Sequence, residues 1–340
     1  MAPEALSVND PRVQHNFLQV DQNIKYHYIV ASPQENPAAV VLLLHGWPDL
    51  AHGWRFQVPY LLSLGLRVVV PDMLGYGQTS APDAPAAYSL RNMSDHLAQL
   101  IRAVSPDAPV VVGAHDWGAF LAWRLAMYHP DLVRAVFCFC IPFAPPQPAA
   151  VVPLEDFVEA NPVFAYQLQN AGPEAEALAG QSPAHLRGFL NAMFGGTTPD
   201  GLPGFDPYVG LIADRLLEVG PSPLVSPEAM HHYVSEFSRN GLHGPMNWYR
   251  TRSINGEEEL PLAKDASAFR FQIPAMLIMA GQDPALTPDL ADGQEVFFAK
   301  GLKKGVIPKA SHWILIHCPE ESNRYIGEFV KDVLSQDYSS

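Results

Sequence analysis

The sequence predicts an α/β protein with a mostly parallel central sheet flanked by helices and interrupted by a helical insertion. Short apolar runs alternate with helical stretches in both end portions of the chain, and prolines concentrate between them. Such alternation implies right-handed crossovers and parallel strands. Of the 340 residues, 48% are hydrophobic and 16% are charged, which is enough for a large buried core and excludes global disorder.

The first portion of the core begins with two strands that are expected to pair antiparallel at one edge of the sheet. The expected strands cover residues 17–20, 24–30, 40–44, 68–70, 109–112 and 133–141, and the expected helices cover 54–64, 90–104 and 118–128. The continuous apolar run Val40–Leu44 is typical of a strand buried on both faces.

The alternation resumes near the C-terminus with strands over 274–280 and 305–307 and a closing helix over 320–334. The core is therefore expected to comprise residues 1–142 and 263–340, with residues 143–262 as the insertion. Of the 33 prolines, 14 fall within 142–227, without a repeating period. We interpret this part as short helices, for example over 154–168 and 183–194, and expect 194–227 to be a loop that covers a pocket.

Charge and cysteine content restrict the partners and the location. The net charge of −14 disfavours nucleic acids and anionic membranes, and no apolar run is long enough to span a bilayer. Cys138 and Cys140 are too close for an unstrained bridge on one strand, and no zinc-ligand spacing occurs. The N-terminal residues do not resemble a secretory signal. We expect a cytoplasmic protein without a metal or organic cofactor, either a monomer or a homodimer.

The segment Val110–Gly118 reads as a strand, a sharp turn and a helix start around Asp116. Small residues, Ala114 and Gly118, lie two positions before and after Asp116, as in a nucleophile elbow. Here the central residue is Asp instead of Ser. The alternative is that Asp116 only caps the following helix.

A second loop, His45-Gly46-Trp47-Pro48, follows another expected strand. In a fold of this kind such a loop contributes a backbone N–H, here that of Trp47, to an oxyanion hole, and the residue after the nucleophile, Trp117, contributes the other. An ordinary Gly-Pro turn would have a similar sequence.

Asp283 and His312 follow the two expected C-terminal strands. Nucleophile, acid and base thus occur in the chain order Asp116, Asp283, His312, which is the order of an α/β-hydrolase triad.

These motifs make the core resemble the α/β-hydrolases, and in particular the soluble epoxide hydrolases. The most specific matching segments are His45–Pro48, Asp72–Gly77, His115–Gly118, Asn161–Leu168 and Gly244–Arg250. The resemblance implies that the insertion is a helical cap and that Tyr166 and Tyr249 hold an epoxide oxygen. Ala114, Ala119 and Ser311 replace residues that are more often Gly in that family, which could alter rate or selectivity.

An aspartate nucleophile points by itself to substrates with an electrophilic sp3 carbon. Serine would form an unreactive ether with such a carbon, whereas aspartate forms an ester that water activated by histidine can cleave. Epoxides and organohalides are the main classes, and we expect a small hydrophobic epoxide with water as the second substrate.

The leaving group separates these two classes. An alkoxide benefits from a proton donor, and an ordinary tyrosine, with a pKa of about 10, can donate at neutral pH. Spacing does not select among the insertion's tyrosines, Tyr166, Tyr208, Tyr233 and Tyr249, whereas the family resemblance selects Tyr166 and Tyr249. A haloalkane dehalogenase with the same triad is the alternative, although Trp47 lies where that family usually has Asn or Glu. A sensor that has lost turnover is a third hypothesis, which the complete triad and the tyrosine motifs disfavour.

Overall fold

The computed structural model describes residues 4–147, 151–264 and 268–335. The described chain forms two compact units. The core unit comprises the described residues of 1–73, 90–146 and 262–340, and the helical unit comprises those of 74–89 and 147–261.

The core unit contains an eight-stranded sheet in the order β1-β2-β4-β3-β5-β6-β9-β10. The strands are β1 (Gln14–Asp21), β2 (Ile24–Ala31), β3 (Val40–Leu44), β4 (Arg67–Pro71), β5 (Val110–His115), β6 (Val133–Phe139), β9 (Ala275–Ala280) and β10 (Leu302–Ile307). β2 pairs antiparallel with β1 and β4, and all pairs from β4 to β10 are parallel. The predicted fold class is confirmed. Ligands of such sheets bind beyond the carboxyl ends of the parallel strands.

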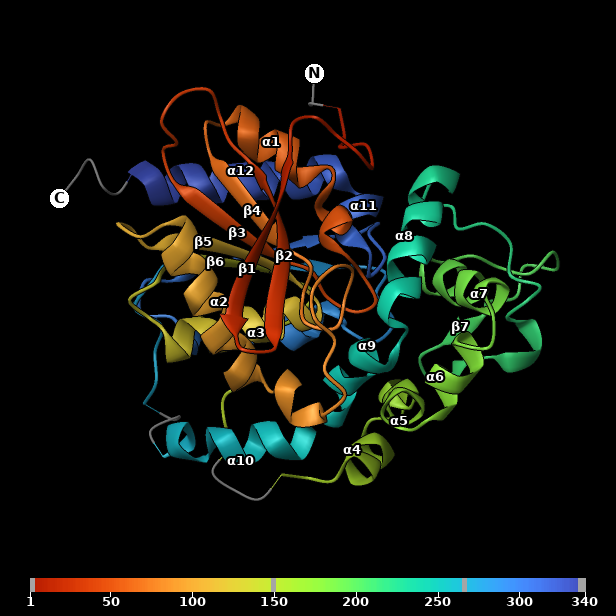
Figure 1. Ribbon diagram of the computed structural model, residues 1–340. Coiled ribbons are helices and arrows are strands. Elements are labelled where there is room, and N and C mark those ends of the chain that lie inside the picture. Colours follow the sequence, from red (N-terminus) through yellow and green to blue (C-terminus); the bar gives the residue numbers. More distant parts are fainter. Residues whose placement is uncertain (1–3, 148–150, 265–267, 336–340) are drawn as a thin grey trace. The chain divides into compact units, whose positions relative to one another are not determined.

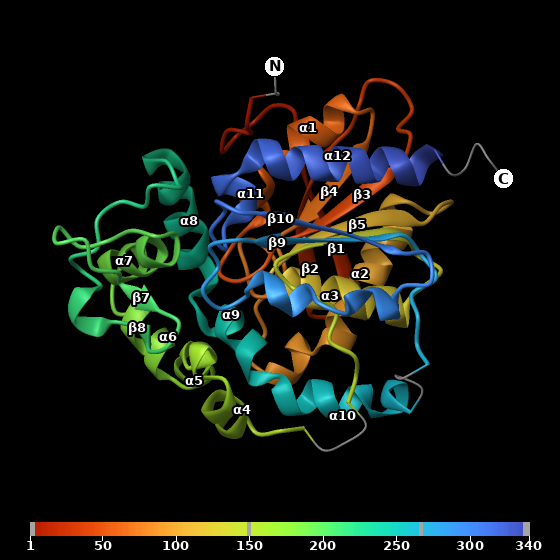
Figure 2. The ribbon, with the colours of Figure 1, turned by 180° about the vertical axis from the view of Figure 1, so that it is seen from behind.

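Helices pack on both faces of this sheet. Figures 1 and 2 show α1 (Gln57–Ser63) and α12 (Pro319–Ser335) on one face, and α2 (Leu90–Val104) and α3 (Trp117–Tyr128) on the other. The central strands are therefore shielded from water on both sides, and Val41–Leu44 of β3 are fully buried. This burial explains why β3 is a continuous apolar run rather than an alternating one.

The predicted core elements all occur, with small differences at their ends. α2 has the predicted bounds, whereas α1 begins at Gln57 because Ala51–Trp54 forms a separate 3-10 turn. β10 begins three residues earlier than predicted, because the partly exposed Lys303 and Lys304 belong to the strand although they interrupt its apolar pattern.

The helical unit is built mainly of short helices. They are α4 (Leu154–Ala160), α5 (Tyr166–Ala171), α6 (Glu174–Ala179), α7 (Pro183–Met193), α8 (Pro227–Asn240), α9 (His243–Asn247) and most of α10 (Arg252–Ala263), with 3-10 turns such as η3 (Pro162–Phe164) and η5 (Trp248–Arg250). The helical stretch predicted over 154–168 is confirmed as the short helices α4, η3 and the start of α5, and α4 ends before Pro162 because proline lacks an N–H and cannot continue it. The predicted loop 194–227 contains a short hairpin, β7 (Phe205–Asp206) with β8 (Gly210–Leu211).

The boundary between the units differs from the predicted one at residues 74–89, which the sequence prediction assigned to the core. The Trp248 indole donates a hydrogen bond to the Leu74 carbonyl at 3.0 Å, and the Asn240 amide donates to the carbonyls of Gly77 and Thr79. Gly75 lies so close to Gly244 that a Cβ on Gly75 would be 2.9 Å from the Gly244 carbonyl carbon. These contacts join the segment to the helical unit.

The three cysteines of the chain, Cys138, Cys140 and Cys318, are buried and form no disulfide. Within the ranges that the structure describes, none of the helices combines the length and the apolar character needed to cross a membrane.

Candidate active site

Asp116 occupies a sharp turn between β5 and α3. Its backbone has φ 53° and ψ −129°, a conformation that L-residues rarely adopt. Its side chain accepts no N-cap hydrogen bond, which would come from the second or third residue of α3, and this argues against the helix-cap alternative. The strained turn instead presents the carboxylate at the carboxyl end of β5, as the elbow pattern predicts.

Two glycines allow the loop after β3 to approach this turn. A Cβ on Gly46 would lie 2.5 Å from Cβ of Asp116, and a Cβ on Gly118 would lie 2.6 Å from the carbonyl oxygens of Leu44 and His45. The close approach brings the Trp47 N–H to 2.8 Å from Oδ1 of Asp116, and the Trp117 N–H also donates to this carboxylate. Both N–H groups predicted for an oxyanion hole therefore face the same side chain.

His45 fixes the orientation of the peptide group that carries the Trp47 N–H. Its Nε2 accepts a hydrogen bond from the Met73 N–H at 2.9 Å, so the proton of the ring is on Nδ1, which donates to the Gly46 carbonyl at 2.9 Å. Burial lowers the pKa of His45, which keeps this arrangement neutral. Because the Gly46 carbonyl and the Trp47 N–H belong to one peptide group, His45 holds the N–H toward Asp116.

His312 lies between the two aspartates of the predicted triad. Its Nδ1 is 2.6 Å from Oδ2 of Asp283, and its Nε2 is 3.6 Å from Oδ2 of Asp116. Asp283 is fixed in turn, because its Oδ1 accepts the N–H groups of Ala285 and Leu286 at 3.0 and 2.9 Å. The three residues predicted from their chain order are thus brought together.

Charge interactions dominate over burial at His312 and Asp283. Burial lowers the pKa of His312, but the negative charges of Asp283 and Asp116 outweigh it and raise this pKa to about 9. Burial raises the pKa of Asp283, but the charge and hydrogen bond of His312 outweigh it and lower this pKa to about 2. At Asp116 burial prevails, so that its pKa is raised despite His312 and the two N–H groups. At neutral pH the site therefore holds an imidazolium paired with carboxylate.

We expect stability to depend on pH through His312. A histidine whose pKa rises from 6.5 to about 9 on folding stabilises the protein below pH 6.5, and this stabilisation is lost as the pH rises through 9. Each pKa unit corresponds to about 1.4 kcal/mol, so the loss is on the order of 3 kcal/mol. Urea unfolding gives the free energy of unfolding of the wild type and of His312→Gln at pH 6 and at pH 10. The stabilisation by His312 is the amount by which this free energy falls more in the wild type than in the variant. Equal pH dependences would contradict the prediction.

His115, next to Asp116, is a site residue to which the sequence analysis assigned no role. Its Nε2 donates to the backbone carbonyl of His312 at 2.9 Å, and the two imidazole rings are 4.9 Å apart. Burial and the charge of His312 lower the pKa of His115 to about 3, so it remains neutral. His115 thus anchors the backbone of His312. The only signal in the sequence is its position before the nucleophile.

His115, Cys140 and His312 have metal-ligating atoms within 4.8 Å of one another. Burial raises the pKa of Cys140 well above its usual range, and a metal ligand must be the thiolate. In addition, Nδ1 of His312 is already bonded to Asp283. The cluster is therefore a poor fit for a metal ion.

The helical unit brings together two of the four tyrosines considered in the sequence analysis. The rings of Tyr166 and Tyr249 have centroids 6.1 Å apart and planes at 81°. Tyr208 is 59% exposed, whereas Tyr233 is fully buried and packs edge-on against Phe194. The pair that the family resemblance selected is thus a spatial neighbour pair within this unit.

Comparison with known proteins identifies the family. Residues 39–317 match the family model described as the alpha/beta hydrolase fold. The chain is 56% identical to epoxide hydrolase srdG of Neurospora crassa, over 98% of this chain and 100% of that protein. It is 32% identical to bifunctional epoxide hydrolase 2 of Sus scrofa, over 96% of this chain but 56% of that longer protein.

Among solved structures, epoxide hydrolase A from Mycobacterium thermoresistibile superimposes with a TM-score of 0.77 at 28% identity, covering 94% of this chain and 98% of that one. The matches extend over most of the chain and include both the elbow and the strands that carry Asp283 and His312. The protein therefore belongs to the α/β-hydrolase family, in which its relatives include epoxide hydrolases.

Proposed function

We propose that this protein hydrolyses small hydrophobic epoxides to vicinal diols through a covalent ester on Asp116. The observation that carries the proposal is an aspartate at the nucleophile elbow, with its carboxylate held by two backbone N–H groups and Nε2 of His312 at 3.6 Å. The names of the relatives agree with this substrate class. The reaction requires water and the side chains of the chain, without a metal or an organic cofactor.

In the first step, a carboxylate oxygen of Asp116 attacks one epoxide carbon and the ring C–O bond breaks. Oδ1 accepts the Trp47 N–H, and we assign the attack to Oδ2, which faces Nε2 of His312 at 3.6 Å. Tyr166 and Tyr249 bind the epoxide oxygen and supply the proton that the developing alkoxide needs. This requirement favours an epoxide over a halide, which leaves without protonation.

In the second step, His312 removes a proton from water, which attacks the ester carbonyl of Asp116. The N–H groups of Trp47 and Trp117 stabilise the oxyanion that forms. The tetrahedral adduct then breaks the ester C–O bond, and the expelled oxygen takes the proton from the His312 imidazolium to complete the diol. The carboxyl proton that remains on Asp116 returns to the tyrosine that donated in the first step. Ester formation removes the charge of Asp116, which is one of the charges that raise the pKa of His312. Alkylation therefore shifts His312 toward its neutral, basic form, while Asp283 orients it and stabilises the imidazolium of the second step.

A single turnover in heavy-oxygen water tests the covalent route. The added oxygen is expected in the carboxylate of Asp116, because the oxygen that the diol gains comes from the original side chain. Peptide mass spectrometry locates the label, and analysis of the diol from the same sample is the control. Labelled diol without labelled protein would refute the ester. Halide release from haloalkanes without diol from epoxides would favour a dehalogenase.

A further inference from the structure

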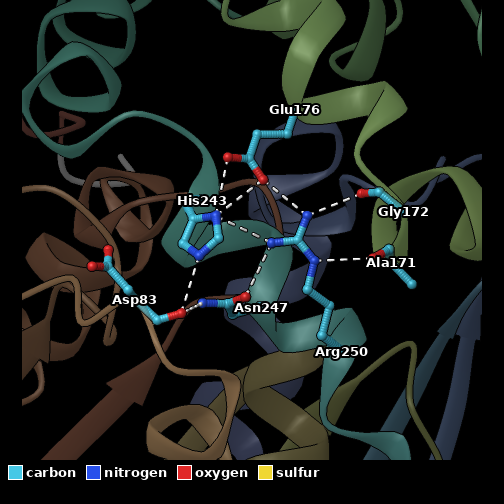
Figure 3. Close-up of polar contacts among 7 residues, drawn as sticks. All are labelled: Asp83, Ala171, Gly172, Glu176, His243, Asn247 and Arg250. Carbon is cyan, nitrogen blue, oxygen red and sulfur yellow. Dashed lines mark hydrogen bonds and ion pairs between the residues drawn. The ribbon is translucent and has the colours of Figure 1, made fainter.

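Arg250 lies at the centre of a polar cluster in the helical unit, shown in Figure 3. Its Nε donates to the Ala171 carbonyl at 3.0 Å, and its Nη2 donates to the Gly172 carbonyl at 2.9 Å. Nη2 also contacts Oε2 of Glu176 at 2.8 Å, and Nη1 donates to Oδ1 of Asn247 at 3.1 Å. The side chain is 17% exposed, so water competes little for these bonds.

These bonds connect the two segments that carry the tyrosines of the proposed site. Tyr166 is the first residue of α5, and Ala171 and Gly172 are at its carboxyl end. Tyr249 precedes Arg250 within η5. The carbonyls at the end of a helix lack partners inside it, and the two nitrogens of Arg250 supply those partners. Arg250 thus fastens α5 to η5, the two segments whose tyrosine rings pack edge to face.

The remaining members of the cluster hold Arg250 in place. Glu176, on α6, contacts Nδ1 of His243 at 3.0 Å and accepts a hydrogen bond from Nη2 of Arg250. Burial raises the pKa of Glu176, but its bonds to Arg250 and His243 outweigh burial and lower it, so Glu176 is ionised. Nε2 of His243 and the amide of Asn247 each donate to the Asp83 carbonyl at 3.0 Å. The arginine is therefore fixed from α6 and α9.

We propose that Arg250 is a positioning residue that sets the relative placement of Tyr166 and Tyr249, so that both hydroxyls reach one epoxide oxygen. This inference rests on the proposed role of the tyrosines as donors. Arginine suits the task because its planar guanidinium binds two adjacent carbonyls and a carboxylate at once, which the ammonium of lysine does not reproduce. Displacing a reacting group by about 1 Å costs on the order of 100-fold in rate.

The test introduces Arg250→Lys into the His312→Gln chain, in which the ester is expected to accumulate. Styrene oxide is the substrate, and rapid quenching followed by intact-protein mass spectrometry measures the rate at which the ester forms. We expect alkylation to slow by about 10- to 100-fold. Ester hydrolysis, measured with His312 intact, is expected to stay unchanged. Glu176→Gln, which keeps the side-chain shape, is expected to slow alkylation less. If Arg250→Lys folds poorly, the alkylation rate of Glu176→Gln tests the same inference.

Arg252→Lys is the matched control. Arg252 also donates from Nε to a carbonyl, that of Val152 at 2.8 Å, and lies over the ring of Phe157. Neither of these two contacts involves α5 or η5, and substitution of Arg252 is expected to leave alkylation unchanged.

A double-substitution comparison separates positioning from a general structural role. With Tyr166→Phe, only one donor remains and its placement relative to the other no longer matters, so the effect of Arg250→Lys should shrink to less than about threefold. An undiminished effect, or an equal slowing of ester hydrolysis, would overturn the inference. If Tyr166→Phe alone leaves alkylation unchanged, the proposed donor role itself fails, whatever Arg250→Lys does.

Discussion

Replacement of His312 by Gln is expected to trap the enzyme as an ester on Asp116. Attack by a carboxylate on an epoxide carbon needs no base, so alkylation proceeds in this variant. Hydrolysis needs a group to remove a proton from water, and the Gln amide cannot do so. The loss of general-base catalysis slows ester hydrolysis by a factor on the order of 10² to 10⁴.

Intact-protein mass spectrometry after addition of an epoxide measures this result as a persistent mass increase equal to that of the epoxide. His129→Gln is the matched control, because His129 also pairs with a carboxylate, that of Asp95 at 2.7 Å, but lies at the opposite end of α3 from Asp116. It should turn over normally and show no adduct. Absence of the adduct in His312→Gln, together with slow diol formation, would mean that water attacks the epoxide directly.

Removal of both hydroxyls in Tyr166→Phe with Tyr249→Phe is expected to block alkylation itself. The epoxide oxygen would then leave as an alkoxide without a donor. Each donor contributes on the order of 2–4 kcal/mol, by comparison with the removal of a donor from an oxyanion hole. The adduct should therefore fail to form, even in the His312→Gln chain.

The same mass measurement, made over time, gives the alkylation rate of this double variant. Tyr208→Phe with Tyr233→Phe removes two hydroxyls from the same unit and is expected to leave that rate unchanged. If the Tyr166 and Tyr249 variant alkylates at the rate of the wild type, the tyrosines are structural. A halide would then become the better candidate for the leaving group.

The sequence by itself determined the elements of the core and the chain order of its chemical groups. Apolar runs such as Val40–Leu44 reflect burial on both faces of a parallel sheet, and this burial leaves a local signal. The order Asp116, Asp283, His312 could be read without coordinates, because each residue follows the end of a strand. Sites in parallel sheets lie at the carboxyl ends of the strands, and this rule predicts that the three residues lie at the same edge of the sheet.

Other features depend on contacts between residues far apart in the chain, and no local pattern contains them. Residues 74–89 join the helical unit through bonds to Asn240 and Trp248, more than 150 positions away. The structure also explains why residues 46 and 118 are glycines. A side chain on Gly46 would collide with Asp116, and one on Gly118 would collide with the loop after β3.

The tyrosines show the same division between sequence and structure. Their spacing left four alternatives open, and only folding showed that Tyr166 and Tyr249 are neighbours. The role of Arg250 became visible in the same way, because its partners are two carbonyls and a carboxylate from segments more than 70 positions earlier. Backbone carbonyls are present at every residue and carry no sequence signal. Only the tertiary structure decides which of them a side chain reaches.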